Sequence, residues 1–272
     1  MDDVPETSGW LSRTETARLE GLRFPKRRTE LRLSRWTAKQ AIARVSGLDV
    51  RHETLARIEV RPAPDGAPTP LLDGSPAPVS VSLTDRADWA VCVAGPPGLA
   101  LGCDLELVEA RSAAFVRDWF TPREQALVAG GYPDLLANLV WSAKESVLKI
   151  LRTGLRRATR SVEVDVHTGG DGWARFTVRA VEGTVFPGWW RRYGDFVLTV
   201  AADTDQGPPV ELEPPPCLAV SDSLAAATPS HRWLTERVQA REAPSGAEQF
   251  NSGTRSLAPA PRPGGAAAPQ DG

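Results

Sequence analysis

The chain has 272 residues, and its 32 lysines and arginines against 34 aspartates and glutamates give a formal net charge of −2. This near balance argues against a nucleic-acid partner, which would demand a broadly basic surface. No apolar run approaches the roughly eighteen residues of a membrane span, and the acidic start lacks the basic and apolar regions of a signal peptide, so we expect a cytoplasmic protein without membrane contact.

The first hundred residues are expected to form one half of the folded part. Helical periodicity predicts a helix over residues 36–45 that ends at Gly47. Alternating apolar residues and turn signals predict the remaining elements, which are a strand over 55–60, a Pro- and Gly-rich loop over 62–78, and strands over 79–83 and 89–94 before a turn at 95–98.

A strand with two carboxylates on one face is predicted for residues 101–107. Apolar side chains alternate there with Gly102, Asp104 and Glu106, and successive side chains of a strand point to opposite faces. Two adjacent carboxylates repel one another and are costly to desolvate, so this face needs a cation or full exposure to water. Gly102 leaves room beside the carboxylates for a bulky neighbour.

A helix is predicted between residues 133 and 154, where apolar residues recur at helical spacing. Glu145 and Lys149 follow one another on a neighbouring stripe of that helix. Packed against the strand, the helix would bring Glu145 beside Asp104 and Glu106. Lys149 would then reach a phosphate bound to the same metal ion.

The second half, residues 101–204, is completed by a helix that starts at residues 121–124 and by strands near 161–166, 173–179 and 196–201. Thr121, Pro122 and Glu124 form a capping-box pattern, which explains Glu124 without any ligand. In each half, a helical pattern is followed by patterns of antiparallel strands. This repeated order predicts an α+β fold of two similar halves.

Residues 205–272 are rich in Pro, Ala, Gly and Ser. Such a segment buries too little apolar surface to offset its ordering entropy, so we predict a disordered tail without a catalytic part. One short helical pattern occurs at residues 233–240 within this tail.

Two stretches together resemble a known family. Gly102-Cys103-Asp104-Leu105-Glu106 and Trp141-Ser142-Ala143-Lys144-Glu145-Ser146-Val147-Leu148-Lys149 are similar to the Gly-x-Asp-x-Glu and Trp-Ser-x-Lys-Glu-(Ser/Ala)-x-x-Lys signatures of the 4'-phosphopantetheinyl transferases. The resemblance is to the larger, monomeric, surfactin-synthetase-activating type, and it extends from about residue 24 to residue 203. Both motifs in this order and at this separation are specific.

The resemblance implies a fold of two similar halves with pseudo-two-fold symmetry and the active site between them. It implies Mg2+-dependent transfer of the phosphopantetheine arm of coenzyme A to a serine of an acyl or peptidyl carrier protein, with release of 3',5'-ADP. By position, Asp104, Glu106 and Glu145 would hold the Mg2+, which prefers octahedral oxygen coordination. Glu145 would also accept the serine proton, and Lys149 would balance charge on the phosphoryl group.

The family contacts the coenzyme A 3'-phosphate with basic residues of the first half. By position, Arg28 and Arg35 are the candidates and Lys39 is a third, although a basic helix face turned to water would look the same in sequence. Ser82, the first residue of the family's Ser-His-Ser, is expected to contact coenzyme A as well.

Two positions depart from the family pattern. Leu83 stands where many members have the histidine of Ser-His-Ser, and Ala67 stands where many have the basic residue of Gly-Lys-Pro or Gly-Arg-Pro. Charged hydrogen bonds contribute about 1.5 to 3 kcal/mol each, so we expect weaker coenzyme A binding with the metal chemistry retained. Arg152 is a candidate for a replacement charge.

Two other functions fit parts of this pattern. A non-catalytic module that binds a carrier protein or coenzyme A would explain Leu83 and Ala67. A metal-dependent nuclease could use Asp104, Glu106 and Lys144, but the balanced charge and the lack of a basic groove argue against it.

Overall fold

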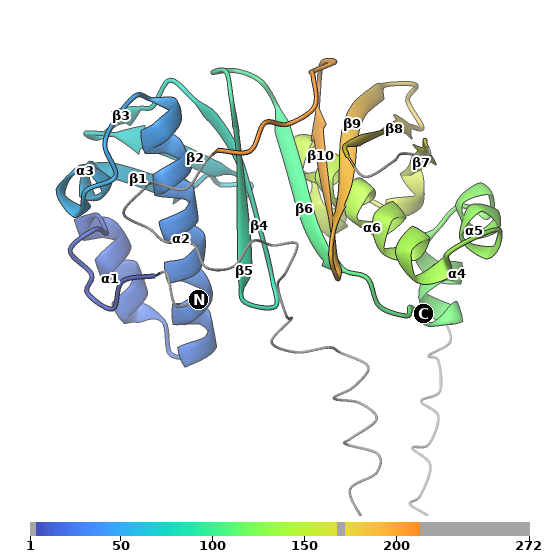
Figure 1. Cartoon of the computed structure of the whole chain (residues 1–272), viewed down its shortest axis with the longest axis horizontal. Coiled ribbons are helices and arrows are strands. Elements are labelled where there is room, and N and C mark those ends of the chain that lie inside the picture. Colours follow the sequence, from blue (N-terminus) through green and yellow to red (C-terminus); the bar gives the residue numbers. More distant parts are fainter. Residues whose placement is uncertain (1–3, 168–171, 213–272) are drawn as a thin grey trace, which may run out of the picture.

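The structure is a computed structural model, and it describes residues 4–167 and 172–212 (Figure 1). These residues form helices and three antiparallel sheets, so the predicted α+β class is confirmed. Figure 1 shows the helices and strands of residues up to about 100 on one side of the molecule and the later helices and strands on the other. The pseudo-two-fold relation between the halves stays a prediction.

The first half contains three helices and two small sheets. Its elements are α1 (Arg13–Gly21), α2 (Pro25–Val45), α3 (His52–Arg57), β1 (Ile58–Pro62), β2 (Pro68–Leu72), β3 (Ser75–Pro76), β4 (Ser80–Arg86) and β5 (Trp89–Gly95). The strands pair in the orders β1-β2-β3 and β4-β5, and α2 covers β4 and β5.

Three predictions for this half were wrong in extent. The helix predicted over 36–45 begins at Pro25, because proline is well suited to the first helical position. The strand predicted over 55–60 begins only at Ile58, after the short helix α3. The predicted loop over 62–78 contains the strands β2 and β3, and Pro68 and Pro70 of β2 lie opposite Pro62 and Val60 of β1.

The second half contains one five-stranded sheet. Its elements are β6 (Leu101–Leu107), α4 (Ala113–Trp119), α5 (Pro122–Ala129), α6 (Pro133–Ile150), β7 (Val162–Val166), β8 (Ala174–Ala180), β9 (Val185–Tyr193) and β10 (Phe196–Ala202). The strand order is β6-β10-β9-β8-β7. The strand β9 is absent from the sequence prediction, because Pro187 and Gly188 interrupt its pattern.

The carboxylate face of β6 packs against α6. An added Cβ at Gly102 would lie 1.8 Å from the backbone oxygen of Ser146, so only glycine permits this close approach. The hydroxyl of Ser142 donates to the backbone oxygen of Asp104 at 2.9 Å. The prediction that this helix packs on the carboxylate face of the strand is therefore confirmed.

Side-chain hydroxyls join β4 of the first half to β6 of the second. Ser82 Oγ accepts from the Cys103 amide at 3.0 Å, and Thr84 Oγ1 accepts from the Leu105 amide at 3.1 Å. A hydrophobic cluster that includes Leu105 and Phe196, with Val91 packed against it, lies between the β4–β5 sheet and the five-stranded sheet of the second half. The two halves thus share a buried interface.

Each half contains a buried lysine–glutamate pair. Lys39 Nζ lies 2.5 Å from Glu15 Oε2, and Lys144 Nζ lies 2.8 Å from Glu124 Oε2. Both lysine side chains are fully buried, and burial lowers the pKa of each while its glutamate partner partly offsets that effect. These pairs anchor α2 to α1 and α6 to α5.

The first residues of the predicted tail contact the sheet. Trp189 Nε1 donates to the backbone oxygen of Gln206 at 2.9 Å, and Tyr193 Oη donates to Glu211 Oε1 at 2.6 Å. Residues 213–272, including the helical pattern at 233–240, lie outside the described residues. None of the helices within the described ranges combines the length and apolar character that crossing a membrane requires.

Candidate active site

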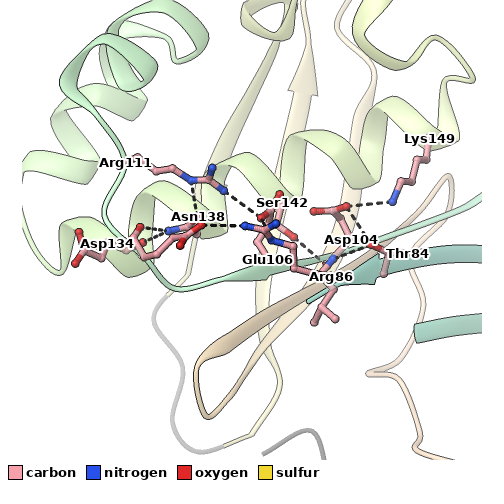
Figure 2. Close-up of polar contacts among 11 residues, drawn as sticks. Thr84, Arg86, Asp104, Glu106, Arg111, Asp134, Asn138, Ser142 and Lys149 are labelled. Carbon is pink, nitrogen blue, oxygen red and sulfur yellow. Dashed lines mark hydrogen bonds and ion pairs between the residues drawn. The ribbon is translucent and has the colours of Figure 1, made fainter. Parts of the chain in front are cut away.

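Asp104 belongs to a polar cluster between β6, β4 and α6, in which it lies beside Thr84 and Lys149 (Figure 2). Its Oδ1 accepts from Lys149 Nζ at 3.1 Å and from Thr84 Oγ1 at 3.3 Å. Its Oδ2 is buried and has no hydrogen-bond partner among the described residues. An unpaired buried carboxylate oxygen is costly, so this atom is suited to accept a cation or a donor from a ligand.

Glu145 contributes a second unpaired oxygen from α6. Its Oε1 is buried without a hydrogen-bond partner in the described part of the chain. Burial raises the pKa of Glu145 to about 7, and the negative charge of Asp104 acts in the same direction. Such a carboxyl group can exchange a proton near neutral pH.

Glu106 is held by two arginines. Its Oε2 lies 3.0 Å from Arg111 Nη2 and 3.5 Å from Arg86 Nε. Burial, together with the charge of Asp104, raises the pKa of Glu106 to about 7 even though both arginines favour the ionised form. Asp104 therefore acts electrostatically on both glutamates, one on its own strand and one on α6.

The chemistry of these groups fits a hard divalent cation. Asp104 Oδ2 and Glu145 Oε1 are buried oxygens without partners among the described residues, and carboxylate oxygen is the ligand that Mg2+ prefers. Within residues 4–167 and 172–212, however, no group of three acidic, histidine or cysteine side chains is already arranged to hold a metal ion. An ion shared by all three carboxylates would require a side chain to move.

Lys149 extends from the last turn of α6 into the same cluster. Its ammonium group donates to the backbone oxygens of Cys103 at 2.6 Å and Leu83 at 3.4 Å, as well as to Asp104. Burial alone would lower the pKa of Lys149, but Asp104 and further neighbours raise it overall. Lys149 therefore carries a positive charge that compensates Asp104 in the structure.

Four further residues complete the cluster and were missed in the sequence, namely Arg86, Glu109, Arg111 and Asn138. Arg86 Nη2 donates to Glu109 Oε1 at 2.9 Å, and Arg111 Nε donates to Asn138 Oδ1 at 2.6 Å. They lie on β4, on the segment after β6 and on α6, and no single periodicity connects these elements. The feature of the sequence that could have indicated the arginines is Glu106, because a glutamate that is buried requires a cationic partner.

Lys144 lies away from this cluster. It is fully buried against Glu124 and donates to the backbone oxygens of Thr159 and Val162. Glu124 is part of the predicted capping box, and its Oε1 accepts from the Val164 amide. Both residues are structural, which removes the lysine that the nuclease hypothesis required.

Ser82 was predicted to contact coenzyme A, and its position does not support this. The residue is only 2% exposed, and its hydroxyl accepts the Cys103 amide that joins the two halves. Its neighbour Thr84 has the same joining role and also donates to Asp104. The physical reason is that a side-chain oxygen replaces the missing backbone ladder between β4 and β6.

Arg35 and Lys39 likewise do not face the carboxylate cluster. Arg35 is 8% exposed and lies 3.5 Å from Glu15, the partner of Lys39. Burial lowers the pKa of Arg35, against the opposing effect of Glu15. These two basic side chains therefore stabilise the first half internally, since a buried carboxylate requires cationic partners.

Arg28 is the remaining basic candidate of the first half. It is exposed near the start of α2, and its Nε donates to the backbone oxygen of Leu22 at 2.7 Å. A pocket lies on another side of α2, between this helix and the β4–β5 turn, and is lined by Lys26, Thr29, Glu30, Leu33, Asp85, Arg86, Ala87 and Asp88. Arg28 is not among the residues that line it.

Arg152 lies beside the loop that departs from the family pattern. Its Nη1 is 3.4 Å from Asp65 Oδ2, and the other oxygen of Asp65 accepts the Ala67 amide at 3.0 Å. Arg152 follows α6 with a left-handed backbone, at a φ of 54°. This contact brings a cation of the second half close to Ala67, as a replacement charge would require.

Residues 100–201 match the family model of the 4'-phosphopantetheinyl transferase superfamily. No curated protein matches the chain in sequence. The matched range covers β6 to β10 and includes Asp104, Glu106, Glu145 and Lys149.

Proposed function

We propose that this chain, whose residues 100–201 match the family model of the 4'-phosphopantetheinyl transferase superfamily, transfers the phosphopantetheine arm of coenzyme A to a carrier-protein serine. The observation that carries the proposal is the pair of unpartnered buried oxygens, Asp104 Oδ2 and Glu145 Oε1, within a cluster that also holds Glu106 and Lys149. We assign the chain to the larger, monomeric type and expect it to act in the cytoplasm.

Asp104, Glu106 and Glu145 would hold the Mg2+ ion. When bound, the ion would neutralise charge on the coenzyme A diphosphate and stabilise the departing 3',5'-ADP. Asp104 is fixed for this role by its bonds to Lys149 and Thr84 through Oδ1, which leave Oδ2 for a ligand.

Glu145 would accept the proton of the carrier serine. A bond then forms between the serine oxygen and the pantetheine-side phosphorus, and the bond from that phosphorus to the bridging oxygen of 3',5'-ADP breaks. Without a metal ion, burial raises the pKa of Glu145 to about 7, and a bound Mg2+ would favour the ionised carboxylate that accepts the proton. Lys149 would offset the charge of Asp104 and of the phosphoryl group in transfer.

Mass spectrometry of carrier proteins tests this function. The purified chain is incubated with coenzyme A, Mg2+ and a panel of apo acyl and peptidyl carrier proteins, beside a known transferase as a positive control. We expect a phosphopantetheine mass gain that Asp104→Ala and Glu145→Gln abolish. Glu182→Gln, a change at a side chain 45% exposed and paired with Arg157, is the matched control and should retain activity. No gain on any carrier, with the positive control active, contradicts the proposal.

A non-catalytic binding module is the second candidate. Leu83 and Ala67, which replace expected anion contacts, favour it. Titration calorimetry separates the two functions, because a pure binder takes up coenzyme A or the carrier without Mg2+ and releases no 3',5'-ADP.

A further inference from the structure

Arg111 connects two of the elements that build the carboxylate cluster. It lies on the segment after β6, and its guanidinium reaches back to Glu106 on β6 and across to Asn138 on α6 (Figure 2). Nη2 donates to Glu106 Oε2 at 3.0 Å, and Nε donates to Asn138 Oδ1 at 2.6 Å. One planar group thus joins a carboxylate of the strand to the helix that carries Glu145.

Asn138 is itself fixed in place. Its side chain is fully buried, and its Nδ2 donates to the backbone oxygens of Glu109 at 2.6 Å and Asp134 at 2.7 Å. The amide oxygen of Asn138 is therefore turned towards Arg111. A buried amide with partners on both of its ends holds a defined orientation.

The arginine contacts with Glu106 share one oxygen. Arg86 approaches the same Oε2, at 3.5 Å, while its Nη2 donates to Glu109 Oε1 at 2.9 Å. Neither of these contacts uses Oε1 of Glu106. Both arginines therefore contact the Glu106 carboxylate through Oε2.

We propose that Arg111, oriented by Asn138, is a positioning residue that holds Glu106 through Oε2 so that Oε1 is presented to the divalent cation. This inference rests on the proposed function. Bidentate guanidinium donors impose a geometry that a lysine ammonium cannot reproduce. Partners that orient metal-ligating carboxylates typically change metal affinity or activity by about 10- to 100-fold when they are removed.

The alternative to positioning is competition, in which the arginines bind Glu106 in place of the cation. The other hydrogen bonds of the two arginines argue against competition. Asn138 holds the Arg111 guanidinium and Glu109 holds the Arg86 guanidinium, so that both approach Glu106 at Oε2. Competition predicts that weakening Arg111 tightens metal binding, whereas positioning predicts that it loosens binding. The two effects therefore differ in sign.

Arg111→Lys is the variant of choice, because it keeps the positive charge and removes the planar guanidinium group with its two donors, Nε and Nη2. The chain offers a closely matched control in Arg157→Lys. Arg157 Nε donates to Ser161 Oγ at 2.7 Å and Nη2 to Glu182 Oε2 at 2.6 Å. The Arg157 side chain is 21% exposed against 18% for Arg111. A second variant, Asn138→Ala, leaves both arginines and all carboxylates in place.

Binding of Mn2+ alone, followed by electron paramagnetic resonance, measures cation affinity without any turnover. We expect Arg111→Lys to raise the Kd for Mn2+ about 10- to 100-fold and Asn138→Ala to raise it about tenfold. Arg157→Lys should leave it unchanged. In the transfer assay, the KM for Mg2+ should rise in the first two variants while the KM for the carrier protein stays constant.

Three outcomes overturn the inference. A Kd for Arg111→Lys within twofold of both the wild type and Arg157→Lys contradicts positioning, and tighter binding indicates competition. If the wild type transfers phosphopantetheine and binds Mn2+ normally, either result refutes this inference alone. If the wild type neither binds Mn2+ nor modifies a carrier, the proposed function itself is wrong and the inference falls with it. Melting temperatures equal for Arg111→Lys and Arg157→Lys verify that both variants fold.

Discussion

The two halves of the molecule each contain a buried lysine–glutamate pair that is built in the same way but has different neighbours. In each half a short helix begins with a capping box, Ser12 with Glu15 and Thr121 with Glu124. Each glutamate also accepts a strand amide, from Val60 or Val164. A lysine of the following long helix then pairs with that glutamate and donates to two backbone oxygens.

The difference lies one residue beyond each lysine. Gln40 follows Lys39 on α2, whereas Glu145 follows Lys144 on α6. Only the second half then sets a strand with Asp104 and Glu106 against this helix. The comparison teaches that the buried lysine supports the fold in both halves, while the residue after it differs, and only the second half places a carboxylate there, within the electrostatic influence of Asp104.

The largest difference between the two halves is expected in how substitutions change the rate of phosphopantetheine transfer. Glu145→Gln, which makes the second half like the first at this position, should reduce transfer by about 10²- to 10⁴-fold, the usual contribution of a general base. Gln40→Glu should change the rate less than twofold. Single-turnover rates with a saturated carrier protein measure both. Equal losses in the two variants would show that the halves are not specialised in this way.

Stability should respond alike in both halves. Lys39→Met and Lys144→Met each leave a buried glutamate without its lysine, and breaking a buried ion pair costs about 3 to 5 kcal/mol. Arg35 lies 3.5 Å from Glu15, so we expect the smaller loss for Lys39→Met. Urea unfolding measures both changes. A loss below about 1 kcal/mol for Lys144→Met would contradict the anchoring role.

Gly102→Ala tests the contact between β6 and α6. The added methyl group would lie 1.8 Å from the backbone oxygen of Ser146, so strand and helix must separate. Overpacking of this kind costs about 1 to 3 kcal/mol and should weaken Mn2+ binding as well. Gly21→Ala is the control, because nothing lies within 4 Å of its added Cβ. Unchanged unfolding and Mn2+ binding in Gly102→Ala would refute the close contact.

The smallest expected effect is a pH dependence of stability that arises from Glu145 and Glu106 in the second half. Without metal, the folded protein keeps a proton on Glu145 up to a pKa of about 7, whereas the unfolded chain releases it near the ordinary glutamate pKa of 4.5. Between these values the folded state binds more protons, so the free energy of unfolding should fall as pH rises.

Glu145→Gln should flatten this slope, and Gln40→Glu should leave it in place. Urea unfolding at several pH values in the presence of a chelator measures the slope in each variant. Glu106, whose pKa is also raised to about 7, should keep a residual slope in Glu145→Gln. A wild-type stability that rises across this range would contradict the assignment.

Local patterns predicted much of the site. The alternation in β6 placed Asp104 and Glu106 on one face, and helical spacing placed Glu145 and Lys149 on one stripe of α6. A further local signal was overlooked. Trp36-Thr37-Ala38-Lys39 and Trp141-Ser142-Ala143-Lys144 are nearly the same, and they mark the two buried lysines.

Partners drawn from distant segments could not be predicted in this way. Arg35 and Ser82 look like ligand contacts in sequence, yet one pairs with Glu15 and the other accepts the Cys103 amide. Arg86 and Arg111 look like ordinary surface residues, yet both hold Glu106. Charge and hydrogen-bonding capacity are visible in a sequence, but the partner is chosen by packing.

By itself, the sequence of this protein determined the residue types and their faces, because the periods of strand and helix follow from backbone geometry. Only the tertiary structure decided which charges meet. Gly102 lets α6 approach β6 closely enough for Glu145 to be affected by Asp104. Burial then determines the protonation of these groups, because desolvation and neighbouring charges act through space and not along the chain.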